Sequence, residues 1–225
     1  MDRYSRNKSM ISEEDQRLLG VSKVCVLGCG GLGGNIIEML GRLGVGTITV
    51  VDGDSFDESN LNRQILSTTE TIGLKKAHVA KNRMNIVNPE IKIISYDNFI
   101  NLENGLEILA DQDIVVDALD SIEIRMEVVK MCDELKIPYV YGAIAGWYGQ
   151  VATILPGDQT LSIINKSKKN KGEEVKLGNP SFTPAFVAAL QVSEVLKLIT
   201  GKGDILRHSF LHIDMLTHEY EIFKL

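Results

Sequence analysis

Short runs of β-branched residues alternate with stretches of helical apolar spacing through most of this chain. The runs predicted as strands are 24–27, 47–51, 91–96, 114–118 and 138–141. The stretches predicted as helices are 35–43, 75–85, 103–109 and 124–135. Strands and helices that alternate with short connections are typical of a parallel, doubly wound α/β sheet. We therefore expect such a sheet to form the main part of the fold.

The pattern changes after residue 148. A strand is predicted at 149–156 and an amphipathic helix at 184–200, while 209–215 and 219–223 alternate like an antiparallel pair. Between them, 157–180 shows no clear periodicity and is predicted as a flexible crossover or lid loop. Its lysines could steer an acidic partner, but a solvated loop is the favoured interpretation. They are Lys166, Lys168, Lys169, Lys171 and Lys176.

Composition limits the protein to a few classes. The chain has 225 residues, 44% hydrophobic content and a formal net charge of −6, which favours one globular domain over 1–225 and makes nucleic acid an unlikely partner. No apolar run approaches the length needed to span a membrane, and residues 1–8 lack the apolar core of a secretory signal. We therefore expect a cytoplasmic protein without a membrane partner.

The cysteines of this chain exclude a four-cysteine zinc site. The three cysteines form no Cys-x-x-Cys pair, so a four-cysteine zinc site cannot be built and reduced thiols are expected. Cys29 lies in a glycine turn, where a small turn residue is favoured over a reactive thiol.

That glycine turn is the first candidate for chemistry. Gly28, Gly30 and Gly33 follow an apolar strand and precede a helix, so a phosphate can approach the backbone and meet the helix N-terminus. Asp52 ends the next strand, where an acidic side chain can accept both ribose hydroxyls. The alternative is a glycine turn used only for close packing of helix on sheet. The order of strand, turn, helix, strand and acid favours a Rossmann-like nucleotide site.

Polar residues that follow the strands indicate that the phosphates react. Arg63 and Asn60 can bind phosphate oxygens, Lys76 adds a positive charge, and Asp120 at the carboxyl edge of the sheet can hold Mg²⁺. Each has a simpler explanation: a surface salt bridge for Arg63, a solvated helix position for Lys76 and a helix N-cap for Asp120. Their joint occurrence at strand ends around one glycine turn favours the site.

Several segments together resemble one enzyme family. They are 3–6 (Arg-Tyr-Ser-Arg), 26–33 (Val-Leu-Gly-Cys-Gly-Gly-Leu-Gly), 51–54 (Val-Asp-Gly-Asp), 59–64 (Ser-Asn-Leu-Asn-Arg-Gln), 72–76 (Ile-Gly-Leu-Lys-Lys) and 117–120 (Asp-Ala-Leu-Asp). With these segments the chain resembles, over nearly its whole length, the MoeB/ThiF/HesA family, the bacterial relatives of ubiquitin-activating enzymes.

The resemblance implies an activity and a set of site residues. In that family ATP, with Mg²⁺, activates the C-terminal glycine carboxylate of a ubiquitin-like sulfur carrier protein as an acyl adenylate. The residues implied around the nucleotide are Gly28, Gly30, Gly31, Gly33, Asp52, Asp54, Ser59, Asn60, Asn62, Arg63, Lys76, Asp120 and Ser121. Among them Arg63, Lys76 and Asp120 would act in catalysis, Asp120 as the Mg²⁺ ligand. Arg6 would reach the phosphates of the other subunit in a homodimer.

The chain also departs from the family pattern. Many members bind zinc through two Cys-x-x-Cys pairs, and some carry a cysteine on the crossover loop, but this chain has neither feature. We therefore expect no zinc and adenylation only, with sulfur supplied separately by a sulfurtransferase or cysteine desulfurase. Ser121 stands where asparagine is common in the family.

Three other functions remain open. An enzyme of the same superfamily could act on tRNA, as the threonylcarbamoyladenosine dehydratases do, although the net negative charge argues against it. A non-catalytic subunit could bind nucleotide or carrier without turnover, but Arg63, Lys76 and Asp120 are all present. A nicotinamide oxidoreductase would need a helix soon after Asp52, where this chain has a polar segment instead.

Overall fold

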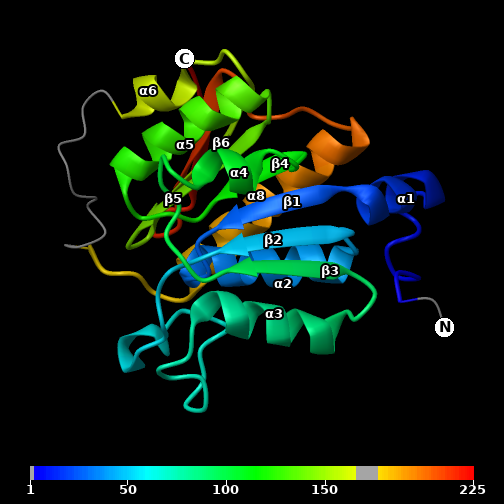
Figure 1. The fold of residues 1–225 in the computed structure, drawn as a ribbon. Helices are drawn as coiled ribbons and strands as arrows, with labels where there is room; N and C mark the ends of the chain where they lie inside the picture. Colours follow the sequence, from blue (N-terminus) through cyan, green and yellow to red (C-terminus); the bar gives the residue numbers. More distant parts are fainter. Residues whose placement is uncertain (1–2, 166–176) are drawn as a thin grey trace.

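One eight-stranded sheet runs through the protein (Figure 1). The computed structural model describes residues 3–165 and 177–225. The strands lie in the order β3-β2-β1-β4-β5-β6-β7-β8. Their bounds are β1 Lys23–Leu27, β2 Thr47–Val51, β3 Lys92–Tyr96, β4 Ile114–Asp117, β5 Tyr139–Ala145, β6 Tyr148–Ile154, β7 Ser209–Asp214 and β8 Glu219–Lys224. The first five are parallel and the last three pair antiparallel, which confirms the predicted fold class.

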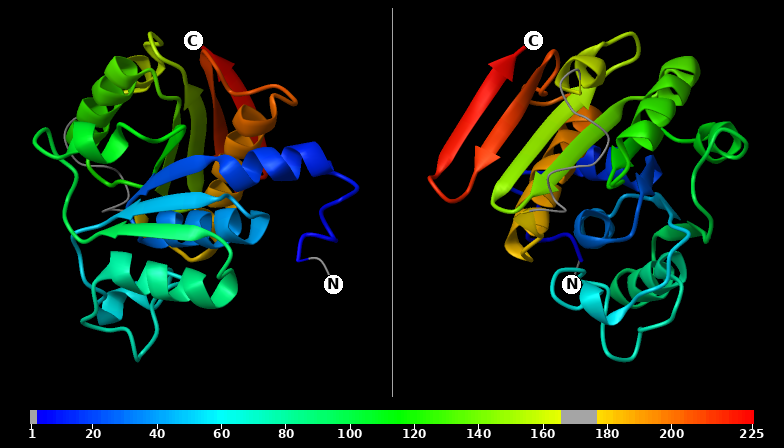
Figure 2. Two further views of the ribbon diagram at one scale, coloured as in Figure 1. Left: turned by 45° about the vertical axis from the view of Figure 1, so that its right-hand side comes forward. Right: turned by 90° about the vertical axis from the view of Figure 1, so that its left-hand side faces the viewer.

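Helices cover both faces of the sheet (Figures 1 and 2). One face carries α1 Glu13–Val21, α2 Gly31–Leu43, α3 Lys76–Val87 and α8 Phe182–Thr200. The other face carries α4 Gly105–Leu109, α5 Ile122–Leu135 and α6 Thr160–Ile164. A short 3-10 helix, η1 Glu58–Asn60, follows β2. The turn between β1 and α2 follows the last residue of β1, so it lies at the carboxyl edge of the parallel strands.

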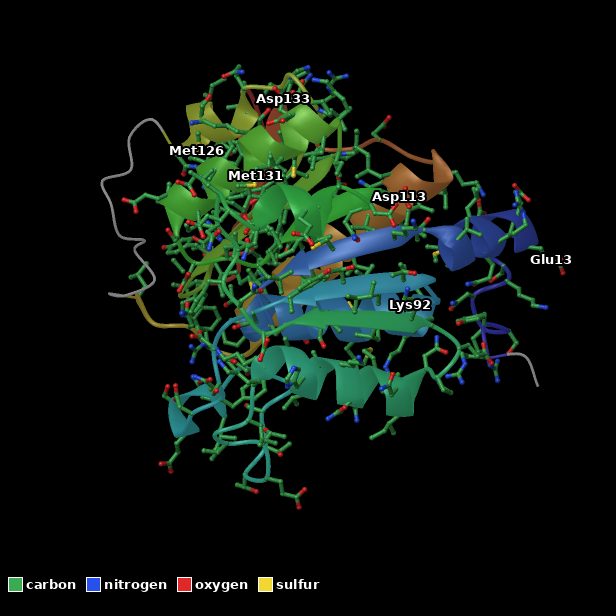
Figure 3. The ribbon with its side chains drawn as sticks, in the orientation of Figure 1. Glu13, Lys92, Asp113, Met126, Met131 and Asp133 are labelled. Atoms are coloured by element: carbon green, nitrogen blue, oxygen red, sulfur yellow. The ribbon has the colours of Figure 1, made fainter. Side chains whose placement is uncertain are left out.

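Each face of the sheet has its own apolar core because successive strand side chains point to opposite sides. In β1, Val24 and Val26 join the core under α2, α3 and α8, whereas Cys25 and Leu27 join the core under α4 and α5. Met131 of α5, labelled in Figure 3, is buried in the second core. This two-sided burial explains why the strand reads as an unbroken apolar run.

Some elements differ from the sequence prediction. The α1 helix was not predicted, although Ser12 and Asp15 form a capping box at its start; it buries only Asp15 and Leu19. The α2 helix begins at Gly31 rather than residue 35, since glycines carry no apolar signal. The segment 157–180, predicted as a loop, contains α6, so the prediction of no regular structure is wrong for 160–164. Its lysines 166–176 lie outside the described residues.

The α8 helix is the central core helix of this fold. Within the described part of the chain it alone is long and apolar enough to cross a bilayer by length and composition. Its buried polar residues instead make hydrogen bonds inside the protein. Gln191 Nε2 donates to the carbonyls of Asp117 at 2.7 Å and Val140 at 3.2 Å, and the Glu194 carboxylate accepts from the Leu206 N–H at 2.8 Å.

Candidate active site

The glycine turn brings the ends of three strands close together. Gly28 has a φ of +99°, and its N–H donates to the Val51 carbonyl at 2.8 Å. A Cβ at Gly28 would lie 2.5 Å from the Ala118 oxygen, and a Cβ at Gly33 would lie 1.8 Å from the Gly28 oxygen. These two glycines are therefore required for packing, as the simpler interpretation proposed. Gly30 and Gly31 have room for a Cβ and line the cavity beside the turn.

Asp52 links this turn to the polar segment that follows β2. Its Oδ2 accepts from the Cys29 N–H at 2.7 Å, and its Oδ1 accepts from the Asp54 N–H at 2.8 Å. Burial raises the pKa of Asp52, while both backbone N–H bonds oppose that shift. Each carboxylate oxygen can accept a further hydrogen bond, as a ribose diol would require.

Lys76 is a buried cation at the start of α3. The residue is 7% exposed, and its Nζ lies 3.1 Å from Asp54 Oδ2. The same Nζ stands 5.9 Å from the ring centroid of Phe56. The alternative of a solvated helix position is therefore wrong. Lys76 instead presents a partly desolvated charge beside an exposed carboxylate.

Arg63 lies beside the glycine turn. Its Nη1 donates to the Ser59 carbonyl at 3.0 Å and to Asn62 Oδ1 at 2.9 Å, and its Cγ packs next to Gly31. Among residues 3–165 and 177–225, no ion pair includes Arg63. The described part of the chain therefore does not support the alternative that Arg63 forms a surface salt bridge. The guanidinium keeps hydrogen-bonding capacity for an anion.

The loop after β4 places Asp120 on the cavity wall. Ser121, not Asp120, is the N-cap of α5, because its side chain accepts from the Ile124 N–H. The N-cap interpretation of Asp120 is therefore wrong, and its exposed carboxylate lines the cavity. A buried ion pair of 3.0 Å between Arg125 and Asp117 lies under this loop, and Arg125 also donates to the Leu119 carbonyl.

These groups surround one cavity of about 440 Å³ at the carboxyl edge of the sheet. The predicted residues that line it are Gly28, Gly30, Gly31, Asp52, Asp54, Ser59, Asn60, Arg63, Lys76 and Asp120. Gly33, Asn62 and Ser121 are not on its wall: Gly33 packs on Gly28, Asn62 bonds Arg63 and the Asn179 carbonyl, and Ser121 caps α5.

Arg6 is not among the residues that line this cavity. Next to it, Arg3 donates to the Val87 carbonyl at 2.6 Å, and the Tyr4 hydroxyl accepts from Asn88 Nδ2 at 2.9 Å. Both partners precede β3, at the amino edge of the strands, whereas the cavity opens at the carboxyl edge. Arg6 itself is exposed.

Sequence reasoning missed several wall residues. Phe99 and Ile100 come from the loop after β3, Arg125 comes from α5, and Asn179 lies more than a hundred residues from the turn. Gln64 was part of a recognised segment but was not assigned to the site. The position of the loop after β3 at the carboxyl edge was the available signal for Phe99, and only the fold brings Asn179 to the cavity.

Cys29 has the character of a packing residue. It is fully buried, and burial holds the pKa of its thiol well above the usual range. A thiol in this environment stays protonated near neutral pH, which supports its interpretation as a small turn residue.

The fold and the cavity define a Rossmann-like α/β protein with a candidate phosphate-binding turn at its topological switch point. More particularly, the chain belongs to the ThiF family, whose model matches residues 4–225. The MoeB/ThiF/HesA prediction is thereby confirmed.

Two similar relatives carry adenylyltransferase names. A "Sulfur carrier protein adenylyltransferase" of Thermus thermophilus is 35% identical, with 96% of this chain and 84% of the relative covered. A "Probable molybdopterin-synthase adenylyltransferase" of Porphyra purpurea is 32% identical, with 99% of this chain but 60% of the relative covered. The chain thus spans most of the first relative and about three fifths of the second. These names agree with the activity predicted from the sequence.

A solved structure shows the same fold. The crystal structure of E. coli MccB with AMPCPP and MccA matches with a TM-score of 0.84 at 24% identity, covering 99% of this chain and 71% of that chain. At this identity the likeness concerns the fold alone.

Proposed function

We propose that residues 1–225 form an adenylation domain that activates the C-terminal glycine carboxylate of a ubiquitin-like sulfur carrier protein ending in Gly-Gly. The observation that carries this proposal is the convergence of Arg63 and Lys76 with the glycine turn on one cavity. The adenylyltransferase names of the relatives support it.

The chemistry needs positive charge more than a base. A carboxylate oxygen of the carrier attacks the α-phosphorus of ATP, and the bond to the bridging oxygen of the β-phosphate breaks, so pyrophosphate leaves with the electron pair. Negative charge grows on the phosphates, and Arg63 and Lys76 stabilise it from fixed positions. Lys76 is paired with the exposed Asp54, which a phosphate oxygen can displace. The half-reaction requires no covalent bond to the protein.

The carboxylates of the cavity fit Mg²⁺ bound together with phosphates. Asp120, Asp54 and Asp57 line the cavity, and within the described ranges no group of three His, Cys, Asp or Glu side chains is arranged to hold a metal. Mg²⁺ at phosphate sites takes only one or two carboxylates with phosphate oxygens and water. Asp120 would hold the ion, which would neutralise charge on the phosphates. Zinc has no place in this proposal.

The partners follow from the same reaction. Residues 157–180 contain no cysteine that could take over the carrier, so a separate sulfurtransferase or cysteine desulfurase would supply sulfur. We place this chemistry in the cytoplasm. In a homodimer, Arg6 of one copy would act at the cavity of the other, because its neighbours Arg3 and Tyr4 are held at the opposite edge of its own sheet.

The direct test is exchange of radiolabelled pyrophosphate into ATP in the presence of a carrier that ends in Gly-Gly. We expect exchange with the intact carrier, none with a carrier lacking its last glycine, and about 100-fold less with Arg63→Ala. Arg17→Ala is the matched control, because Arg17 pairs with Glu14 on the surface of α1.

Two outcomes would overturn the proposal. Equal exchange by Arg63→Ala and the unaltered chain would remove the role of the cationic cavity. Exchange that required tRNA instead of the carrier would favour the dehydratase alternative.

A further inference from the structure

Phe99 is a large aromatic residue left open on the cavity wall. Its side chain lies in the loop between β3 and α4, and the residue is 64% exposed. The next residue, Ile100, is 4% exposed and anchors this loop in the core beneath α4 and α5. The loop is thus fixed on one side by Ile100, while Phe99 lines the cavity.

Hydrogen bonds hold the backbone of Phe99 in place. Asn104 Nδ2 donates to the Phe99 carbonyl at 2.9 Å, and Asn104 Oδ1 accepts from the Asn101 N–H at 2.9 Å. Asn101 Oδ1 in turn accepts from the Glu103 N–H at 2.8 Å. A loop bonded in this way presents the ring without the entropy cost of ordering a free segment.

The ring lies beside the residue next to Asp52. A Cβ added at Gly53 would be 2.7 Å from a ring carbon of Phe99, so the ring packs against the Gly53 backbone. Lys75 fixes that backbone, because its Nζ donates to the Gly53 carbonyl at 2.6 Å. The glycine turn contacts Asp52 through the Cys29 N–H, and Arg63 packs next to Gly31 of that turn.

The glycine turn, Asp52 and Phe99 suit the phosphates, the ribose and the base of one nucleotide, in that order. With phosphates at the glycine turn and the ribose hydroxyls on Asp52, the base extends beyond Asp52, toward Phe99. We propose that the Phe99 ring is the platform on which the purine base of the nucleotide stacks. This inference rests on the proposed function for the presence of a nucleotide, and it adds the residue that binds the base.

The cavity wall also contains apolar residues that suit a purine base. Val51, Ile100 and Leu119 line the same cavity with aliphatic side chains, so the base enters an apolar slot with one open aromatic face. Stacking of a base on an aromatic side chain changes binding by about tenfold or more.

The test measures equilibrium binding of ATP and of inorganic tripolyphosphate by calorimetry. We expect Phe99→Ala to weaken ATP binding about tenfold and to leave tripolyphosphate binding unchanged, whereas Phe99→Trp retains ATP affinity. Leu102→Ala is the matched control, since Leu102 is 65% exposed in the same loop and is not on the cavity wall.

A spectroscopic readout reports the contact directly. Phe99→Trp combined with Trp147→Phe leaves one tryptophan in the chain, because Trp147 is the only native one. We expect ATP to quench its fluorescence and tripolyphosphate to leave it unchanged. Thermal melting without nucleotide shows whether each variant is folded.

The outcomes separate this inference from the proposed function. If the unaltered chain binds ATP and Phe99→Ala binds it equally well, the stacking platform is refuted while adenylation stands. If the unaltered chain binds no ATP, the proposed function fails and the stacking platform fails with it.

Discussion

At the residue scale, the cations of the cavity differ in how they are held. Lys76 is buried and paired with Asp54, whose side chain is 55% exposed. Arg63 bonds to the Ser59 carbonyl and to Asn62 Oδ1. A buried ammonium with an exposed partner attracts phosphate strongly, because the partner regains water when it is displaced.

Lys76→Gln tests this arrangement. We expect pyrophosphate exchange to fall about 100-fold, since the amide fills similar space without positive charge. Lys81→Gln is the control, because Lys81 is an exposed residue of the same helix. Full exchange by Lys76→Gln at saturating ATP would contradict the assigned role.

At the element scale, the unit of β1, turn and α2 depends on contact between backbones. Gly33 belongs to the first turn of α2, and the space for its Cβ is occupied by the Gly28 carbonyl. Gly20 belongs to α1 and has no atom within 4 Å of a Cβ. The two helical glycines therefore meet opposite environments.

Alanine substitution at these glycines should change the free energy of unfolding in opposite directions. Gly33→Ala should destabilise the protein by more than about 2 kcal/mol, because the backbone must move to relieve the clash. Gly20→Ala should stabilise it by about 0.5–1 kcal/mol through helix propensity and reduced unfolded-state entropy. Urea unfolding monitored by circular dichroism measures both changes. A Gly33→Ala variant as stable as the unaltered chain would disprove the clash.

At the scale of the whole molecule, the two edges of the sheet have separate roles. The carboxyl edge holds the cavity, while the amino edge anchors Arg3 and Tyr4 next to Arg6. A residue on the amino edge can serve the reaction only in another copy of the chain.

Subunit complementation tests this arrangement. If Arg6 acts across a homodimer, Arg6→Ala and Arg63→Ala are each defective alone, yet a mixed dimer contains one site with both arginines. We expect equal mixing and re-equilibration to restore roughly a quarter of unaltered exchange activity. No recovery from a mixture shown by light scattering to be dimeric would exclude the role of Arg6 in trans.

Local sequence signals were sufficient for the parallel part of the fold. The apolar runs, the glycine turn and the polar residues after each strand are short-range features, and they located Asp52, Arg63, Lys76 and Asp120 at the cavity. Strand ends are informative because parallel strands bring their carboxyl ends to one edge whatever the loops contain.

Tertiary packing decided the features that depend on contacts between distant segments. Arg125 is held at the site by its ion pair with Asp117. Asn179 lines the same cavity although it is more than a hundred residues from the glycine turn in the sequence. The α1 and α6 helices each bury only two residues, and the sequence prediction did not include them. The place of Phe99 on the cavity wall also depends on the fold, because the sequence does not distinguish it from other exposed aromatic residues.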